Sequence, residues 1–445
     1  MSCVLGTEII LQLNMSNEVE WKPLNVIVLG GGIGGLACAV AMRRAAHQVT
    51  VYERSDFCGE VGAAISCASN GGKWLHEWGI DMEKTKPVIL KSLIKHRWND
   101  GEVFETLAFD GYEKHFGVPY YNFHRKDIHS SLYDAATNVN RDGTPAQIVL
   151  NHEAVEIDYE TCSVTFENGK TVSGDIILAA DGIRSRTKPQ LGITPVFEKA
   201  DSSCIRVLYD SEKAKQLGLL DFASNDAIEF WGTNENKIVM SPCENGRTVC
   251  CLCFYKCSEK SYNTFNRKVS LERLLEVLPD LDPQLCQIFK ECGYEIKEWG
   301  LYIHEPLPYF FKASKSGKKG VALVGDAAHP MMPDQAQGAV SAIEDAGCLG
   351  EVFSKEHDLS VEESLMIYES VRKERVTKIQ DASLRARRNL NERMGWNKDL
   401  ANPHKLSLVE VCGYDMKDHI KQAVKSIKQK QFVTYSAEQF VHILS

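Results

Sequence analysis

The strongest constraint on the fold is a glycine-rich turn that joins an apolar segment to a stretch of small residues. Residues 24–40 read LNVIVLGGGIGGLACAV, in which residues 25–29 are typical of a buried strand. A small-residue helix is expected over about 34–46, and the strand-like QVTVYE follows at 48–53. This order of strand, glycine turn, helix and strand predicts a β-α-β unit of a parallel sheet.

The spacing of the glycines indicates a nucleotide as the ligand of this turn. Gly30 permits the tight turn, Gly32 lets backbone N–H groups approach a pyrophosphate, and Gly35 lets the helix pack against the strand. Glu53 ends the second strand, where a carboxylate accepts ribose hydroxyls and repels a phosphate on the ribose. FAD or NAD is therefore favoured over NADP here. The alternative is a glycine turn that binds no ligand.

Two further strands far along the chain point to a discontinuous domain. The segments DIILAADG at 175–182 and GVALVGDAAH at 320–329 both end in turns typical of the carboxyl edge of a parallel sheet. Between them, SCIRVLYD, AIEFWGTNENKIVMS and RTVCCLCFY alternate strand and hairpin patterns. An antiparallel sheet inserted into a parallel-sheet domain is the resulting prediction, and the insert is expected to form a wall of the substrate site.

These patterns divide the chain into four predicted parts. Residues 1–23 form an N-terminal tail, and residues 24–195 with 309–390 form the discontinuous nucleotide-binding domain. Residues 196–308 form the mainly antiparallel insert, and residues 391–445 form a C-terminal helical segment. The fold class is therefore α/β, with a Rossmann-like domain, an inserted antiparallel sheet and C-terminal helices.

Charge and hydropathy exclude two classes of partner. The 51 lysines and arginines stand against 60 acidic residues, so the chain has no basic field for nucleic acid or an anionic membrane. No apolar stretch approaches the ~20 residues that cross a bilayer, and the first twenty residues lack a secretory signal. We expect a soluble, cytoplasmic protein.

The cysteines predict no metal site. Among the 15 cysteines, the group in CENGRTVCCLCFYKC at 243–257 lacks the paired spacing of zinc ligands. Residues 248–255 are better interpreted as a buried strand in which cysteine is a small apolar side chain.

A second motif lies in the segment ALVGDAAHPMMPDQAQGAVSAIEDA at 322–346. Asp326 follows a buried strand, where its carboxylate suits a sugar-alcohol chain; the alternative is a residue that only caps the turn. A helix is expected to begin near Gln337 and Gly338, so that its free N–H groups and partial positive charge face what lies before it. A reduced flavin carries negative charge that suits this helix end.

Together these motifs resemble the class A FAD-dependent monooxygenases, the aromatic hydroxylases that include salicylate hydroxylase and related fungal biosynthetic enzymes. The likeness covers about residues 25–390. It rests on the glycine fingerprint with Glu53, on AADGIRSRTK around Asp181 and Gly182, on GDAAHP at 325–330, and on HRKDIHSSL around Arg125. The resemblance implies a Rossmann-like FAD-binding domain with an inserted substrate domain.

The resemblance also implies which residues contact the cofactor. Segments 61–65 and 333–339 are expected to border the isoalloxazine. The residues assigned to FAD are Gly30, Gly32, Gly35, Glu53, Arg54, Gly62, Ala63, Arg125, Asp181, Asp326, Gly338 and Ala339. Outside the family context Arg125 would be interpreted as a surface arginine. His329 follows the second motif, and a positioning role is favoured over catalysis.

The implied reaction starts with reduction of FAD by NADH or NADPH. A flavin C4a-hydroperoxide formed with O2 then transfers one oxygen atom to an electron-rich aromatic small molecule, phenolic or indolic. Arg206 is a cation in an otherwise apolar strand and is the candidate catalytic residue, because it could stabilise a substrate anion. The alternative is that Arg206 faces solvent.

Departures from the family pattern leave the substrate open. Ala336 and Lys188 replace residues that are often Gly and Arg, and Ser241 stands where many phenol-directed relatives have Tyr. The rival hypotheses are a flavin-dependent epoxidase, a halogenase and an FAD-retaining protein without activity. The W-x-W-x-x-P pattern of halogenases does not occur in the sequence.

Overall fold

The computed structural model describes residues 21–57, 64–194, 197–219, 226–257, 266–396 and 402–429. Its central element is a six-stranded sheet with the order β19-β20-β12-β1-β2-β8. All neighbouring strands in this sheet are parallel except β19, which pairs antiparallel with β20. The strands of this sheet are β1 (Asn25–Leu29), β2 (Gln48–Tyr52), β8 (Gln147–Val149), β12 (Ile176–Ala179), β19 (Phe311–Ala313) and β20 (Gly320–Leu323).

The predicted β-α-β unit is confirmed. β1 runs into α2 (Ile33–Arg44), and β2 returns parallel to β1. Ten of the twelve residues of α2 are buried, because small side chains let the helix pack between the sheet and α11 (Gly338–Val352). The helix is accordingly short of polar residues, as a buried helix must be.

The parallel sheet collects strands from distant parts of the chain. β12 pairs with β1 on one side and with β20 on the other, although the paired residues lie about 145–150 positions apart in sequence. The expected discontinuous α/β architecture is therefore present. α12 (Val361–Arg388) packs against α11, and its N-terminus has a capping box formed by Ser360 and Glu363.

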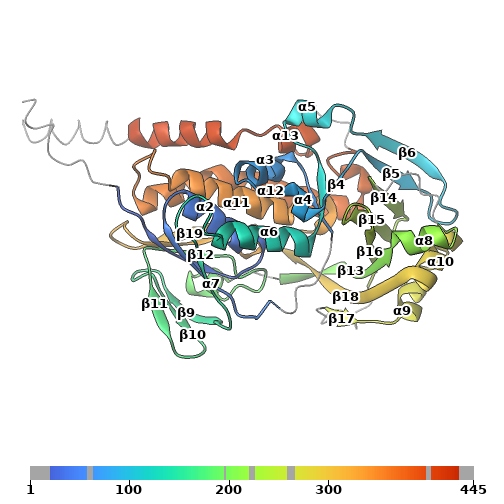
Figure 1. The fold of residues 1–445 in the computed structure, drawn as a ribbon, viewed down its shortest axis with the longest axis horizontal. Coiled ribbons are helices and arrows are strands. Elements are labelled where there is room, and N and C mark those ends of the chain that lie inside the picture. The colour runs from blue at the N-terminus through green and yellow to red at the C-terminus, as the bar shows by residue number, and fades with distance from the viewer. Residues whose placement is uncertain are drawn as a thin grey trace, which may run out of the picture.

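A second sheet of eight strands occupies the other end of the molecule (Figure 1). Its order is β17-β18-β13-β16-β15-β14-β5-β6, and all pairs are antiparallel except β14 with β5. Its strands are β5 (Ser92–His96), β6 (Val103–Ala108), β13 (Phe197–Asp210), β14 (Ala227–Gly232), β15 (Lys237–Cys243), β16 (Thr248–Lys256), β17 (Arg267–Lys268) and β18 (Gly293–His304). The sheet thus recruits residues 92–108, which precede the predicted insert; the predicted domain limits themselves stay a prediction.

The two faces of this sheet serve different purposes. Cys251 and Cys253 of β16 pack in an apolar cluster with α9 (Leu271–Glu276) and α10 (Pro283–Cys292). Leu252 and Phe254, the alternate residues, face the opposite way into a cavity described below. The cysteine-rich segment is therefore the predicted buried strand.

Smaller elements complete the fold. Two three-stranded sheets, β11-β10-β9 and β3-β7-β4, flank the nucleotide-binding domain. Their strands are β3 (Ala64–Cys67), β4 (Val88–Ile89), β7 (Tyr121–His124), β9 (Ala154–Asp158), β10 (Ser163–Phe166) and β11 (Thr171–Ser173). The remaining helices are α3 (Ser69–Glu77), α4 (Met82–Thr85), α5 (Tyr112–Phe116), α6 (Arg125–Thr137), α7 (Thr187–Gln190), α8 (Ser211–Gln216) and α13 (Leu408–Cys412), and the short turns are η2 (Gly325–Ala327), η3 (Pro333–Gln335) and η4 (Leu390–Glu392).

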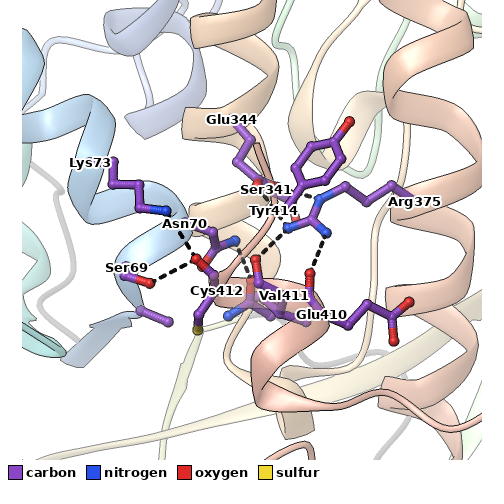
Figure 2. A network of polar contacts seen from close by, with 12 residues as sticks. Ser69, Asn70, Lys73, Ser341, Glu344, Arg375, Glu410, Val411, Cys412 and Tyr414 are labelled. Carbon is purple, nitrogen blue, oxygen red and sulfur yellow. Dashed lines mark hydrogen bonds and ion pairs between the residues drawn. The ribbon is translucent and has the colours of Figure 1, made fainter. Parts of the chain in front are cut away.

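The C-terminal segment is tied to the core by polar contacts. Figure 2 shows Arg375 of α12 reaching both Glu344 of α11 and the carbonyl oxygens of α13. The carbonyl oxygen of Cys412 also accepts hydrogen bonds from Ser69 and Lys73 of α3. A further helix spans residues 416–429, as predicted for this segment. Among the described residues, no helix combines the length and the apolar character needed to cross a membrane.

Candidate functional site

A cleft of about 370 Å³ opens at the carboxyl ends of β1, β2 and β12. This is the edge at which parallel α/β sheets bind nucleotides. Six of the residues predicted to contact FAD contribute to its wall: Gly30, Gly32, Glu53, Arg54, Arg125 and Asp181. The sheet thus brings together residues that are up to about 150 positions apart in sequence.

The three fingerprint glycines have separate steric tasks. Gly30 has φ +98°, and an added Cβ would lie 2.4 Å from the carbonyl oxygen of Ala180. A Cβ on Gly35 would lie 1.9 Å from the carbonyl oxygen of Gly30, so Gly35 fits helix to strand without lining the cleft. At Gly32 an added Cβ meets no atom within 4 Å, because this position faces the open cleft. A ligand backbone can therefore approach Gly32 closely.

Two carboxylates of the cleft are held in place by local hydrogen bonds. The amide N–H of Gly31 donates to Oε2 of Glu53 at 2.6 Å, and the backbone N–H and hydroxyl of Ser55 donate to Oε1 at 2.8 Å. Oδ2 of Asp181 accepts hydrogen bonds from the amide and the hydroxyl of Thr187. Oδ1 of Asp181 is buried without a hydrogen-bond partner. This orphaned oxygen fits a ligand that supplies a donor.

Cations surround the same cleft. The half-buried Arg125 begins α6, and Arg54 is exposed at the rim. The sequence interpretation missed Arg184 and Arg186, which also line the cleft and follow the Asp181–Gly182 turn. Such a surplus of guanidinium groups suits a pyrophosphate.

Lys188 was noted only as a departure from the family pattern, yet it is buried close to the cleft. Desolvation lowers the pKa of its ammonium to about 8, against the opposing influence of Asp181 and Asp326. Its Nζ donates to the carbonyl oxygen of Ile183 at 3.1 Å. Lys188 therefore adds a cation between the two predicted cofactor carboxylates.

A second pocket of about 270 Å³ lies between the eight-stranded sheet and the loop 331–339. Its walls are mostly apolar, with Ile228, Val239 and Leu252 on the sheet side. Three predicted cofactor residues, Asp326, Gly338 and Ala339, line the same pocket. It thus combines an apolar chamber with one end of the predicted flavin site, as expected for a wall formed by the insert.

Asp326 connects the two cavities. Its side chain is exposed within the second pocket. Desolvation by the surrounding protein raises the pKa of its carboxyl group, and the positive charges of His329, Lys188 and Arg125 act to lower it. Arg125 belongs to the first cleft, so its electrostatic contact with Asp326 places the cavities next to each other. The turn η2 that carries Asp326 has no side-chain cap.

The N-terminus of α11 faces this junction. α11 begins at Gly338, as predicted, and its N-cap residue Gln337 provides no side-chain cap. Asn70 of α3 donates to Oε1 of the buried Gln337 at 2.9 Å, while Nε2 of Gln337 has no hydrogen-bond partner. The first turn of α11 also contains no acidic residue. Its partial positive charge is therefore available to an anionic group.

Four charged groups near the second pocket were not singled out by the sequence interpretation, although Asp334 lies in the segment 333–339 that was expected to border the isoalloxazine. The buried Lys237 of β15 pairs with the buried Asp334, and Arg387 of α12 also approaches this carboxylate. Arg393, which follows η4, lines the pocket directly. Local sequence gave no signal for this cluster, because its members come from the insert, the second motif and the end of α12.

Arg206 is buried, so the alternative of a solvent-facing residue is wrong. Its Nη2 donates to Oε2 of Glu295 at 3.0 Å, and its guanidinium lies 5.3 Å from the ring centre of Trp299. Its neighbour in the sheet register is Leu252, which lines the pocket, but Arg206 itself is outside the lining. Its catalytic role stays a prediction.

His329 lies in the interior rather than in either cavity wall. Its Nε2 is 2.6 Å from Oδ2 of Asp345, and the ring is almost fully buried. The amide of Gly325 donates to the same carboxylate oxygen, so His329 and Asp345 fix the loop that carries Asp326. This geometry supports a positioning role.

Two of the residues predicted to contact FAD, Gly62 and Ala63, lie outside the described residues, so these two predictions stay open. Within the described chain, potential metal-ligand atoms of His124, Asp127 and Glu244 lie within 4.8 Å of one another, and these residues line neither cavity.

The two cavities together fit FAD. The open space at Gly32, the orphaned Oδ1 of Asp181 and the surrounding guanidinium groups suit the dinucleotide part. Asp326 and the uncapped start of α11 suit the ribityl chain and the flavin ring. Fold and site therefore define a flavoprotein with an adjoining apolar pocket.

Comparison with known proteins agrees with this class. The family described as pyridine nucleotide-disulphide oxidoreductase matches residues 24–218, and the family described as FAD binding domain matches residues 310–383. Hispidin-3-hydroxylase of Neonothopanus nambi is 30% identical over 79% of this chain and 86% of its own. The FAD-dependent monooxygenase cfoG of Aspergillus candidus is 28% identical over 80% of this chain and 84% of its own.

Solved structures show the same fold. CtdE in complex with FAD and its substrate has a TM-score of 0.75 at 18% identity, covering 91% of this chain and 100% of that one. A salicylate hydroxylase substrate complex has a TM-score of 0.69 at 20% identity, covering 90% and 98%. The chain belongs to the FAD-dependent monooxygenases. It is an enzyme whose cofactors are FAD and the NAD(P)H that reduces it, as predicted.

Proposed function

We propose that the enzyme uses NAD(P)H and O2 to place one oxygen atom on an electron-rich aromatic small molecule, phenolic or indolic, in secondary metabolism. The observation that carries this proposal is the apolar pocket that shares Asp326 and the start of α11 with the cofactor site. Its volume of about 270 Å³ lies near the lower end of small-molecule sites. The names of hispidin-3-hydroxylase and 6-hydroxynicotinate 3-monooxygenase support an aromatic substrate.

The residues of this chain divide the work between binding and exclusion of water. Reduced FAD would activate O2. We take this reaction to follow the course that the resemblance to the class A monooxygenases implies. Ile228, Val239 and Leu252 provide an apolar wall against which an aromatic ring packs and from which water is excluded. The start of α11 stabilises negative charge on the ring system bound before it. A cytoplasmic location is part of the same proposal.

The deciding experiment is product analysis by mass spectrometry. The purified yellow enzyme is incubated with NADPH or NADH, a panel of phenolic and indolic metabolites, and isotopically labelled dioxygen. The proposal requires a product that carries one labelled oxygen atom on the aromatic substrate. NAD(P)H oxidation that yields only hydrogen peroxide with every member of the panel would contradict an aromatic acceptor. A labelled epoxide would instead assign the rival reaction of the same family.

A further inference from the structure

Among the described residues, the second pocket is lined by two carboxylates, Asp326 and Asp334, and three cations gather on the side of Asp334. Lys237 and Arg387 both approach Oδ1 of Asp334, the latter at 3.4 Å, while Oδ2 has no hydrogen-bond partner. Both cations also lie over the ring of Phe254, at 5.3 and 4.4 Å from its centre. Asp334 is thus paired with two positive groups, and no third ion pair with it is formed among the described residues.

Arg393 is that third cation, and it lies in the pocket wall. Its residue is 3% exposed, and its guanidinium stacks 5.0 Å from the ring centre of Phe230, which also lines the pocket. No carboxylate among the described residues forms an ion pair with it. The neighbouring Tyr120 is almost fully buried, and desolvation raises the pKa of its hydroxyl against the opposing influence of Arg393, so this group is neutral and gives Arg393 no counter-charge.

The backbone on both sides of Arg393 is held by one side chain of the second motif. Gln335 is fully buried; its amide nitrogen donates to the carbonyl oxygen of Glu392 at 2.9 Å, and its amide oxygen accepts from the N–H of Met394 at 2.8 Å. Gln335 lies in the loop whose neighbours Asp334 and Ala336 line the pocket. The position of Arg393 is therefore fixed relative to the cofactor side of the chamber.

A buried cation without a counter-charge is costly, because desolvation removes water that no protein acid replaces. We propose that Arg393 binds an anionic oxygen of the substrate, a carboxylate or the oxygen of an acidic enol, and so selects acidic aromatic substrates. This inference rests on the proposed function and names its substrate class. Lys237 adds positive potential without a direct role, since Asp334 holds it.

The same placement explains how an acid would be oriented. Arg393 and the first residues of α11, Gly338 and Ala339, line one chamber. An acid group held at Arg393 leaves the rest of the ring within that chamber. A planar guanidinium gives a carboxylate two parallel hydrogen bonds, which fix orientation as well as position.

The test compares acid and neutral probes on the FAD-loaded enzyme by titration calorimetry. For the carboxylate, the probes are para-coumaric acid and its methyl ester; for the acidic enol, they are triacetic acid lactone and its methyl ether. The variants are Arg393→Met and Arg393→Lys, with Arg388→Met as control, because Arg388 is exposed five residues earlier on α12. Each variant is checked for FAD content and thermal unfolding.

At least one acid should bind the wild-type enzyme roughly ten- to a hundredfold more tightly than its neutral partner, the range for a charge-assisted hydrogen bond. Arg393→Met should remove this preference while leaving the neutral probe unchanged, Arg393→Lys should restore part of it, and Arg388→Met should retain it. A preference for para-coumaric acid over its methyl ester would identify the anion as a carboxylate. A preference for triacetic acid lactone over its methyl ether would identify it as an acidic enol.

Equal binding of acid and neutral probes by the wild-type enzyme overturns the inference, even if Arg393→Met fails to fold. Oxygenation of neutral aromatics with no acid preference would leave the proposed function intact and reject the role of Arg393. Conversely, acid-selective binding without labelled product would support the role of Arg393 and reject the proposed function.

Discussion

Two buried ionic clusters in this enzyme differ in their charge balance. Behind α11, Arg372 and Arg375 face Glu344 and Asp345, so two guanidiniums meet two carboxylates (Figure 2 shows Arg375 with Glu344). Beside the second pocket, Lys237 and Arg387 pair with Asp334, while Arg393 lines the pocket without an ion pair among the described residues. The first cluster lies inside the protein, whereas the second borders a cavity.

The difference separates a structural use of charge from a binding use. A balanced cluster neutralises its own charges, so it can fix α11 against α12 and α13 without any ligand. An unbalanced cluster at a cavity requires an external anion to neutralise its excess positive charge. The comparison therefore predicts that changes behind α11 alter stability, and that changes around the cavities alter binding.

The largest expected effect separates cofactor binding from folding. Gly32→Val should abolish FAD retention while the protein stays folded, because a Cβ at this position meets no protein atom within 4 Å and projects into the cleft. The measurement is the ratio of flavin to protein absorbance, with circular dichroism as the check of folding. Gly232→Val is the matched control: a Cβ at this position also meets no atom within 4 Å, and the residue lies outside both cavities. Normal flavin content in Gly32→Val would contradict the role of this glycine.

The cofactor half of the site could be predicted from sequence because its signals are local. The positions of Gly30, Gly32 and Gly35 follow from a turn, a close approach and a helix contact within six residues. The same holds for the start of α11 at Gly338, where small residues follow a proline-containing turn. These constraints fall at fixed positions of one short segment and leave a pattern that can be read there.

The substrate half could not be predicted, because it is assembled by register and packing. Strand alternation left the face of Arg206 open, and only pairing with Leu252 places it on the pocket side. Arg393 lies near the pocket because Gln335 holds residues 392 and 394, a contact across about 58 positions. The parallel pairing of β14 with β5 is another long-range event without a local signature.

The second prediction concerns the balanced cluster. Arg372→Met should lower the free energy of unfolding by about 3–5 kcal/mol, because it removes one partner from buried ion pairs with Glu344 and Asp345. The measurement is urea unfolding at saturating FAD. The acid-to-neutral binding ratio of the folded fraction should not change. Glu374→Gln, an exposed neighbour on α12, is the control and should leave stability unaltered.

Acid should weaken the same cluster in a defined pH range. Desolvation raises the pKa of Asp345, but His329 and Arg372 outweigh it and bring the value down from 3.8 to about 2. The depressed pKa means that the stabilisation is complete above the unfolded-state value and is lost as pH falls through about 4 to 2, a contribution of about 2 kcal/mol. Urea unfolding across this range should show a shallower pH dependence for Asp345→Asn than for the wild-type enzyme. Identical slopes would contradict this linkage.

The smallest effect is expected for Arg206→Ala. Its guanidinium is already engaged by Glu295 and Trp299 and lies one strand away from the pocket lining. It can act on substrate through Leu252, so we expect kcat/KM to fall by no more than about tenfold, or about 1.4 kcal/mol, with FAD content unchanged. The measurement is product formed per NAD(P)H consumed at subsaturating substrate, with peroxide release as its complement.

Glu295→Gln provides the matched variant, because it weakens the ion pair of Arg206 while keeping the guanidinium. If Arg206 acts only through packing of the sheet, the two variants should lose similar, small amounts of kcat/KM with unchanged coupling. A loss near a hundredfold in Arg206→Ala alone, with increased peroxide release, would mean that Arg206 contacts the substrate anion directly. The pocket would then bind the substrate acid with two guanidinium groups, those of Arg206 and Arg393, rather than with Arg393 alone. The excess of positive charge beside Asp334 would extend to β13.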